Sequence, residues 1–275
     1  MKIVAVMGSS KNGNTTEVVQ YFEKKLTERL RCEFEYLYLS DYPLDFCVGC
    51  HNCIFTGQDK CPHHPVVKAM EDKMIAADGI ILATPGYMFS VTGIMKNFLD
   101  HVAYNCHRPK YFGKKAFLIS SCTKWQVKGV FIPLQTWVTA AGFRLAGKLF
   151  VEMLPFPLRE KELDKKRRMI AKAAARFAGE LQRKGEIKPD FGRVMVYHAF
   201  RTLCQIAPRI LRADYQYFDG INAFDQDTKW YIPARVSNFQ HRLANFMERR
   251  IGKAVLKMVD RARLEGDGRD FRNRL

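Results

Sequence analysis

Residues 2–16 read KIVAVMGSSKNGNTT, an apolar run that leads into a loop of glycine, hydroxyl and amide side chains. The run 2–7 is short, rich in β-branched residues and bounded by glycine, which predicts a buried strand. The residues after the loop place apolar side chains at helical spacing: Val18, Val19, Phe22, Leu26 and Leu30. This stretch therefore predicts a strand, a polar loop and a helix in direct succession.

The same alternation continues along the chain. Further strands are predicted at 33–38, 79–84, 116–120 and 144–151, and helices at about 65–76, 94–102, 129–141 and 160–184. Alternating strands and helices are typical of an α/β fold with a parallel sheet covered by helices on both faces. Gly185 and Pro189 mark a boundary, so we expect one domain over 1–184 and a mainly helical extension over 185–275. Helices are expected there at about 194–212 and 234–264.

The net charge is +17, from 45 Lys and Arg against 28 Asp and Glu. The positive charge is spread through the chain, and its densest run, 165–168, lies on a predicted helix that needs a solvated face. We therefore expect no nucleic-acid partner, only a general affinity for anionic cofactors such as NADPH. The chain starts in a strand pattern, and its longest apolar stretch, 194–207, is shorter than the ~20 residues that span a bilayer. These features predict a cytoplasmic protein with no membrane span.

The loop after the first strand is a candidate phosphate site. Free backbone N–H groups and the helix dipole favour an anion at a helix start, and hydroxyl, amide and ammonium groups add donors and charge. The residues expected to hold the anion are Ser9, Ser10, Lys11, Gly13, Asn14 and Thr15. The alternative is a polar turn that only starts the helix, with Asn14 and Glu17 forming a capping box.

This loop, the segment TPGYMFS at 84–90 and the segment KNFLD at 96–100 together resemble the NADPH-dependent FMN reductase and iron–sulfur flavoprotein group. The resemblance covers about residues 1–150 and implies a flavodoxin-like, doubly wound five-stranded sheet of order 2-1-3-4-5. FMN would then lie at the carboxyl ends of the first and third strands. Its ring contacts would be Pro85, Gly86, Tyr87, Met88 and Phe89, with Ser121 in a third loop. Ordinary packing is the alternative for Tyr87 and Phe89.

Cysteines form the strongest local motif. Residues 47–53 read CVGCHNC, and Cys61 follows after seven further residues. This spacing predicts that Cys47, Cys50, Cys53 and Cys61 ligate a [4Fe–4S] cluster, and it resembles the motif of iron–sulfur flavoproteins. An all-cysteine zinc site and a thiol loop without metal remain alternatives. The other four cysteines lack such spacing and are expected to be buried apolar residues: Cys32, Cys106, Cys122 and Cys204.

These features favour an FMN-dependent oxidoreductase that takes electrons from NAD(P)H or ferredoxin, with the cluster relaying single electrons. No catalytic side chain is obligatory, because the flavin carries the chemistry. One alternative is a non-enzymatic electron carrier or redox sensor with a structural cysteine loop, and another is an anion-binding module for nucleic acid or membrane. The extension 185–275 is expected to pack its own core or to form a dimer contact or pocket. A homo-oligomer is expected.

Overall fold

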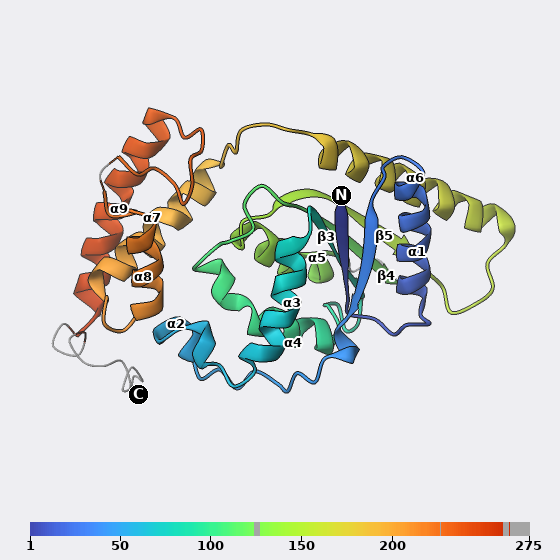
Figure 1. Ribbon diagram of the computed structural model, residues 1–275, viewed down its shortest axis with the longest axis horizontal. Coiled ribbons are helices and arrows are strands. Elements are labelled where there is room, and N and C mark those ends of the chain that lie inside the picture. Colours follow the sequence, from blue (N-terminus) through green and yellow to red (C-terminus); the bar gives the residue numbers. More distant parts are fainter. Residues whose placement is uncertain (124–126, 226, 261–263, 265–275) are drawn as a thin grey trace. The chain divides into compact units, whose positions relative to one another are not determined.

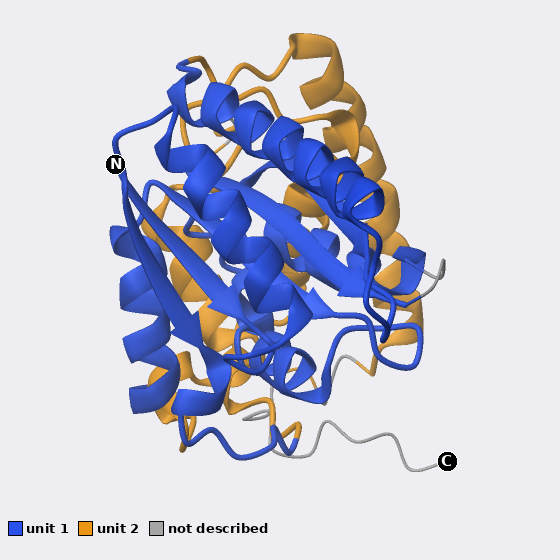
Figure 2. Ribbon diagram, turned by 90° about the vertical axis from the view of Figure 1, so that its right-hand side faces the viewer, with its two compact units in different colours: residues 1–48, 65–184 blue, residues 49–64, 185–275 orange. Residues whose placement is uncertain are grey.

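The computed structural model describes residues 1–123, 127–225, 227–260 and 264. Within them the chain divides into two compact units, which Figure 2 distinguishes by colour. The first unit comprises residues 1–48 and 65–184, and the second comprises residues 49–64 and 185–275.

A parallel sheet of order β2-β1-β3-β4-β5 forms the centre of the first unit. The strands are β1 (Lys2–Met7), β2 (Glu33–Tyr38), β3 (Gly79–Pro85), β4 (Lys115–Cys122) and β5 (Arg144–Glu152). This is the strand order of a flavodoxin-like fold. The predicted strands, their order and the parallel α/β class are confirmed.

Helices cover both faces of this sheet (Figure 1). Helices α1 (Asn14–Thr27) and α6 (Glu160–Gln182) lie on one face. The other face carries α3 (His64–Ala76), α4 (Gly93–His101) and α5 (Val127–Ala140). Alternate β1 side chains enter the two cores, Ile3 and Met7 toward α1 and α6, and Val4 and Val6 toward the opposite layer. A one-residue slip would exchange the two sets, so this burial fixes the strand register.

The second unit is helical, as expected for the extension. It contains α2 (Asn52–Phe55), α7 (Phe191–Ile206), α8 (Arg212–Gly220) and α9 (Asn238–Met258). Helix α7 packs against α8 and α9, and α2 packs against α8. Asp190 caps α7 by accepting from the N–H of Arg193 at 3.0 Å, and Ser237 with Gln240 forms a capping box at the start of α9.

Two expectations for the extension change. The single helix expected over 194–212 is wrong at 207–211, because Pro208 disfavours helical geometry at Ala207, where φ is −130°. The last helix, expected over 234–264, spans only Asn238–Met258, because Ser237 caps its start; residues 261–263 lie outside the described residues. None of the described helices is long and apolar enough to cross a membrane.

The aromatic side chains of the extension pack a core of their own. Tyr197 lies 5.8 Å from Phe218 and 4.8 Å from Tyr231 between ring centroids, and all three rings are buried. Trp230 packs against the same group, with its ring centroid 5.7 Å from that of Tyr197. These rings therefore stabilise the second unit.

Candidate functional site

The loop between β1 and α1 reaches the carboxyl edge of the sheet with an uncapped helix start. Gly13 is the N-cap residue of α1, and it makes no side-chain capping hydrogen bond. In the described part of the chain, no protein acceptor is found for the N–H groups of Asn14 and Thr15. The capping-box alternative is wrong, since Asn14 is already inside the helix. Helix starts with free N–H groups attract anions.

Hydroxyl groups tie this loop to β4. The Oγ1 atom of Thr15 lies 2.7 Å from the Oγ atom of Ser121, and both residues are buried. Thr16, which no sequence pattern assigned to the site, donates to the carbonyl of Ser10 at 2.7 Å, and its hydroxyl lies 3.3 Å from that of Ser9. The structure therefore brings the expected residues of the first and third loops together, with Thr16 holding the backbone turn.

Lys11 has a partner of its own. Its ammonium group lies 2.9 Å from the Asp41 carboxylate and 5.5 Å from the ring centroid of Tyr38. Both members of the ion pair are exposed, and such pairs contribute roughly 0–1 kcal/mol. An incoming phosphate could therefore compete for this lysine at small cost.

The loop after β3 forms a strained, exposed turn, the 87–90 turn. Tyr87 and Ser90 exchange backbone hydrogen bonds at 3.0 and 2.9 Å, while Met88 and Phe89 have φ values of 44° and 61°. Positive φ is uncommon in residues with side chains and costs on the order of 1–3 kcal/mol. The three apolar side chains are exposed by 63%, 88% and 57%, for Tyr87, Met88 and Phe89 respectively. Ordinary packing of Tyr87 and Phe89 is therefore wrong.

Two close approaches fix this turn against its neighbours. The N–H of Gly86 donates to the carbonyl of Ser121 at 3.0 Å. Gly129, in the first turn of α5, passes so near that a Cβ atom there would lie 1.7 Å from the carbonyl oxygen of Phe89. Only a residue without a side chain fits at that position.

A buried threonine joins the first two loops. Thr92 caps α4, and its hydroxyl donates to the carbonyl of Gly8 at 2.8 Å. The Oγ1 atom of Thr84, at the end of β3, lies 3.2 Å away. Gly8 in turn donates to the carbonyl of Ala83 at 2.8 Å. The loops after β1 and β3 are thereby held at one edge of the sheet by contacts that no sequence motif indicated.

The cysteine segment is divided between the two units. In the first unit, the N–H of Cys47 donates to Oδ1 of Asn97 at 3.1 Å, and the Asn97 amide donates to the carbonyls of Leu44 and Asp45 at 3.0 and 3.2 Å. Asn97 is nearly buried, at 8% exposed. This single side chain on α4 therefore orders the backbone that leads to Cys47.

The second unit carries the remaining three cysteines of the motif. Cys53 lies in α2, and the N–H of Cys61 closes a turn by donating to the carbonyl of Gln58 at 3.1 Å. All four thiols of the motif are free of disulfides. Among the described residues, no three His, Cys, Asp or Glu side chains are grouped so as to hold a metal ion. The four thiols are a donor set that suits a thiolate-ligated metal.

The other cysteines differ in burial. Cys204 is buried as expected, whereas three are half-buried: Cys32, Cys106 and Cys122. Burial raises the pKa of Cys106 to about 11, which makes its thiol unreactive at neutral pH. The expected burial is confirmed for Cys204 and is only partial for the other three, of which Cys32 and Cys106 pack against the two cores of the sheet.

A buried polar cluster joins α7 to α9. The Glu248 carboxylate lies 2.7 Å from Nδ1 of His198, and it accepts from Nε of Arg201 and the hydroxyl of Thr202 at 3.0 and 2.9 Å. Burial alone would raise the pKa of Glu248, but these donors lower it to about 2. The cluster was not indicated by sequence spacing, because its members are far apart along the chain.

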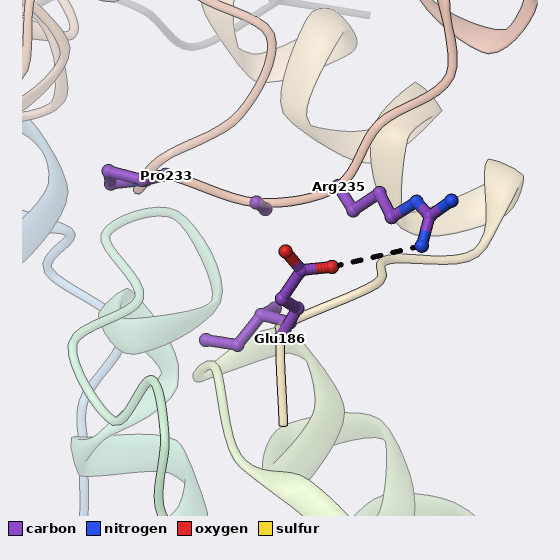
Figure 3. A pocket seen from close by; sticks show the side chains of 5 residues that line it. Glu186, Pro233 and Arg235 are labelled. Carbon is purple, nitrogen blue, oxygen red and sulfur yellow. Dashed lines mark ion pairs between the residues drawn. The ribbon is translucent and has the colours of Figure 1, made fainter. Parts of the chain in front are cut away.

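An open pocket lies on the second unit (Figure 3), with a volume of about 510 Å³ and a lining of Glu186, Ile187, Pro233, Ala234 and Arg235. Glu186 and Arg235 face each other at 4.0 Å across it. Both are exposed, so the pair adds little stability. None of its lining residues is a thiol, an imidazole or a buried polar group.

Comparisons with known proteins identify the family of the chain. A family model described as NADPH-dependent FMN reductase matches residues 1–144. An iron–sulfur flavoprotein of Archaeoglobus fulgidus is 25% identical over 225 residues, covering 79% of this chain and 97% of that protein. An iron–sulfur flavoprotein of Methanocaldococcus jannaschii is 37% identical over 101 residues, covering 36% of this chain and 51% of that relative, about half its length.

Among solved structures, an FMN-dependent NADH-azoreductase from Bacillus anthracis, in complex with FMN, is similar with a TM-score of 0.50. The match covers 65% of this chain and 100% of the other, at 12% identity. At that identity the similarity shows the fold alone.

Proposed function

The chain belongs to the NADPH-dependent FMN reductase family, a family of oxidoreductases, and we propose that it binds FMN and reduces it with NAD(P)H. The observation that carries the proposal is the uncapped start of α1 at Gly13, which leaves N–H groups free at the carboxyl edge of β1. In a doubly wound sheet this edge is where ligands bind.

The phosphate of FMN would be held by the first loop. The residues proposed for this role are Ser9, Ser10, Lys11, Gly13, Asn14 and Thr15. Backbone N–H groups and the dipole of α1 favour the dianion, while Thr15 joins this loop to Ser121. These residues bind and orient the cofactor.

The isoalloxazine ring would lie against the 87–90 turn, with Pro85, Gly86, Tyr87, Met88 and Phe89 as its contacts. Support comes from three large apolar side chains that stay exposed on a strained turn, an arrangement found more often at ligand sites than in packed loops. Bound FMN would supply the hydride chemistry, so the proposal assigns no acid or base to a side chain. The turn would exclude water from one face of the ring.

We propose further that Cys47, Cys50, Cys53 and Cys61 hold a [4Fe–4S] cluster. The ferredoxin-like spacing and the names of the two relatives support this assignment. Zinc in the same thiols, or no metal, are the competing outcomes of the test.

We propose further that residues 1–184 form the FMN-binding domain and residues 185–275 a helical extension. The proposal also includes ferredoxin as an alternative electron donor, a homo-oligomeric state and a cytoplasmic location. A non-enzymatic electron carrier is the second candidate function. Sedimentation and cell fractionation test the assembly and the location.

The deciding experiment is anaerobic purification followed by an absorption spectrum and by flavin, iron, zinc and acid-labile sulfide analysis. We expect one FMN per chain and about four irons with matching sulfide. Flavin without iron would remove the cluster and keep the reductase, whereas absence of flavin binding would overturn the central proposal. Anaerobic mixing with NADPH, NADH or reduced ferredoxin then identifies the donor. Flavin that no nicotinamide bleaches would favour the electron carrier.

Serine variants locate the metal. Each of the four substitutions Cys47→Ser, Cys50→Ser, Cys53→Ser and Cys61→Ser is expected to lower the iron content without removing flavin. Cys32→Ser is the matched control, because Cys32 is half-buried and lies outside the motif. Equal iron in the motif variants and the control would contradict the ligand assignment.

A further inference from the structure

Helix α9 presents an outward face that differs in chemistry from the face that packs against α7. Ala244 and Glu248 are buried on the inner side, and a Cβ at Gly252 would lie 3.3 Å from Thr202 of α7. On the outer side Phe239 and Phe246 are exposed by 74% and 56%. Two phenylalanines separated by seven residues lie on the same side of a helix.

Cations surround these two rings. Helix α9 carries five basic side chains: Arg242, Arg249, Arg250, Lys253 and Lys257. All five residues are exposed, and in the part of the chain that the structure describes none of them forms an ion pair. The Arg250 guanidinium instead lies 5.8 Å from the ring centroid of Phe246.

Among the described residues of α9, no carboxylate lies on the outward face beside these cations. Glu248 is the helix's one acidic residue, and its carboxylate is turned inward, where it binds His198 and Arg201. The donors that lower its pKa belong to α7, so this charge is neutralised inside the unit. The outward face therefore combines exposed aromatic side chains with uncompensated positive charge.

We propose that the outward face of α9 binds an anionic phospholipid surface. The helix, about 30 Å long, would lie parallel to the bilayer, with Phe239 and Phe246 inserted among the headgroups and the basic residues on the lipid phosphates. Basic helices with exposed aromatic residues bind membranes by this combination of burial and charge. The site goes beyond the proposed flavin chemistry, whose residues lie in other elements.

Charge also decides between this occupant and a second copy of the chain. Pairing two copies through this face would bring two sets of five cations together, which is unfavourable. Nucleic acid would satisfy the charge, but a single helix face with two phenylalanines also offers apolar area that a phosphate backbone does not use. An anionic bilayer satisfies both components.

The charge test uses the full chain with its bound flavin and vesicles of phosphatidylcholine with and without phosphatidylserine. We expect binding only to the anionic vesicles. The triple variant Arg250→Gln, Lys253→Gln, Lys257→Gln is expected to bind about a hundredfold more weakly, from the usual contribution of a basic residue near an anionic surface. The matched control removes three exposed charges from α6, by Lys161→Gln, Arg168→Gln and Lys172→Gln, and is expected to bind nearly as wild type.

The apolar test replaces both rings, by Phe239→Ser and Phe246→Ser. We expect binding to the same vesicles to weaken at least tenfold, because the variant loses the apolar area of both inserted rings. Phe156→Ser is the control, since Phe156 is 70% exposed in the first unit. Far-UV circular dichroism and the melting temperature check that each variant keeps the helix content and stability of the wild type.

Several results would overturn the proposal. If the wild-type chain binds no vesicles, or binds neutral and anionic vesicles equally well, the proposal is wrong. This result does not depend on the folding of any variant. An equal loss in the α6 control would show that net charge alone drives binding. Tighter binding to duplex DNA than to vesicles, or a change of oligomeric state in the phenylalanine variant, would assign the face to nucleic acid or to a second copy.

Discussion

Replacing Gly129 by alanine is expected to displace the 87–90 turn. The added Cβ would lie 1.7 Å from the carbonyl oxygen of Phe89, where real contacts stay beyond about 3.0 Å, so turn or helix must move by roughly 1.3 Å. Alanine would otherwise stabilise α5 by up to about 1 kcal/mol over glycine. Overpacking costs typically about 1–3 kcal/mol, so a net loss of roughly 1 kcal/mol is expected. That loss lowers the Tm by about 2–4 °C.

The functional consequence follows from the proposed ring contacts. Misplacing a binding element by about 1 Å can cost on the order of a hundredfold in rate. We therefore expect anaerobic stopped-flow bleaching of the flavin by NADPH to slow by one to two orders of magnitude. Fluorescence titration of FMN is expected to show weaker binding in the same variant.

Gly179→Ala is the matched control, because Gly179 lies in helix α6 and a Cβ there would meet nothing within 4 Å. This variant is expected to gain stability and to keep wild-type flavin kinetics. If Gly129→Ala behaves in the same way, the close approach at Phe89 is wrong. If Gly129→Ala loses stability but reduces flavin at the normal rate, the 87–90 turn does not hold the ring.

Three further predictions concern the loop, the cysteine segment and the second unit. Gly13→Asp is expected to weaken FMN binding at least tenfold, because it places a carboxylate in the phosphate site. The added Cβ would lie 2.8 Å from the Ser10 hydroxyl oxygen, so that side chain must turn away, and the few tenths of a kcal/mol that Asp contributes over Gly as an N-cap are expected only in part. Gly13→Asn meets the same contact without the charge, so FMN titration and melting of both variants separate the charge from the contact. Asn97→Ala removes the acceptor of the Cys47 N–H and the hydrogen bonds to the carbonyls of Leu44 and Asp45. Faster alkylation of Cys47 is therefore expected in the iron-free chain. An unchanged alkylation rate would show that Asn97 does not order this backbone. The pKa of Glu248 is lowered to about 2, so its stabilising contribution, at most about 3 kcal/mol, is fully present above about pH 5 and is lost as the pH falls through about 2. Urea unfolding of wild type and Glu248→Gln is expected to show a stability difference at pH 7 that shrinks toward pH 3, and a constant difference would refute the linkage.

The parallel sheet was predictable because strands that are buried on both faces appear in the sequence as short, continuous apolar runs. The run 79–84 contains almost no polar residue. In the segments between the strands, apolar side chains recur every three or four residues, which is the spacing of one helix face. The break at Pro208 was also encoded, but the helical pattern on both sides hid it. Local sequence thus accounts for the elements of the first unit.

The contacts that hold the candidate site together could not be predicted in the same way. Thr92 meets Gly8 across 84 residues, and Thr15 meets Ser121 across 106. Neither pair has a spacing that sequence reading can detect, because tertiary packing creates it. The positive φ values of Met88 and Phe89 run against the usual preference of such residues and were equally hidden.

The division of the chain has a consequence for biosynthesis. Helix α2, which carries Cys53, packs against α8, and more than 150 residues separate Phe55 from Arg212. At a translation rate of about 5–20 residues per second, α2 leaves the ribosome roughly 8–30 s before its packing partner has been synthesised. Three of the four motif thiols, those of Cys50, Cys53 and Cys61, therefore lie during this interval in a segment whose own unit has not yet formed, and insertion of any metal there is expected only after α8 has been synthesised.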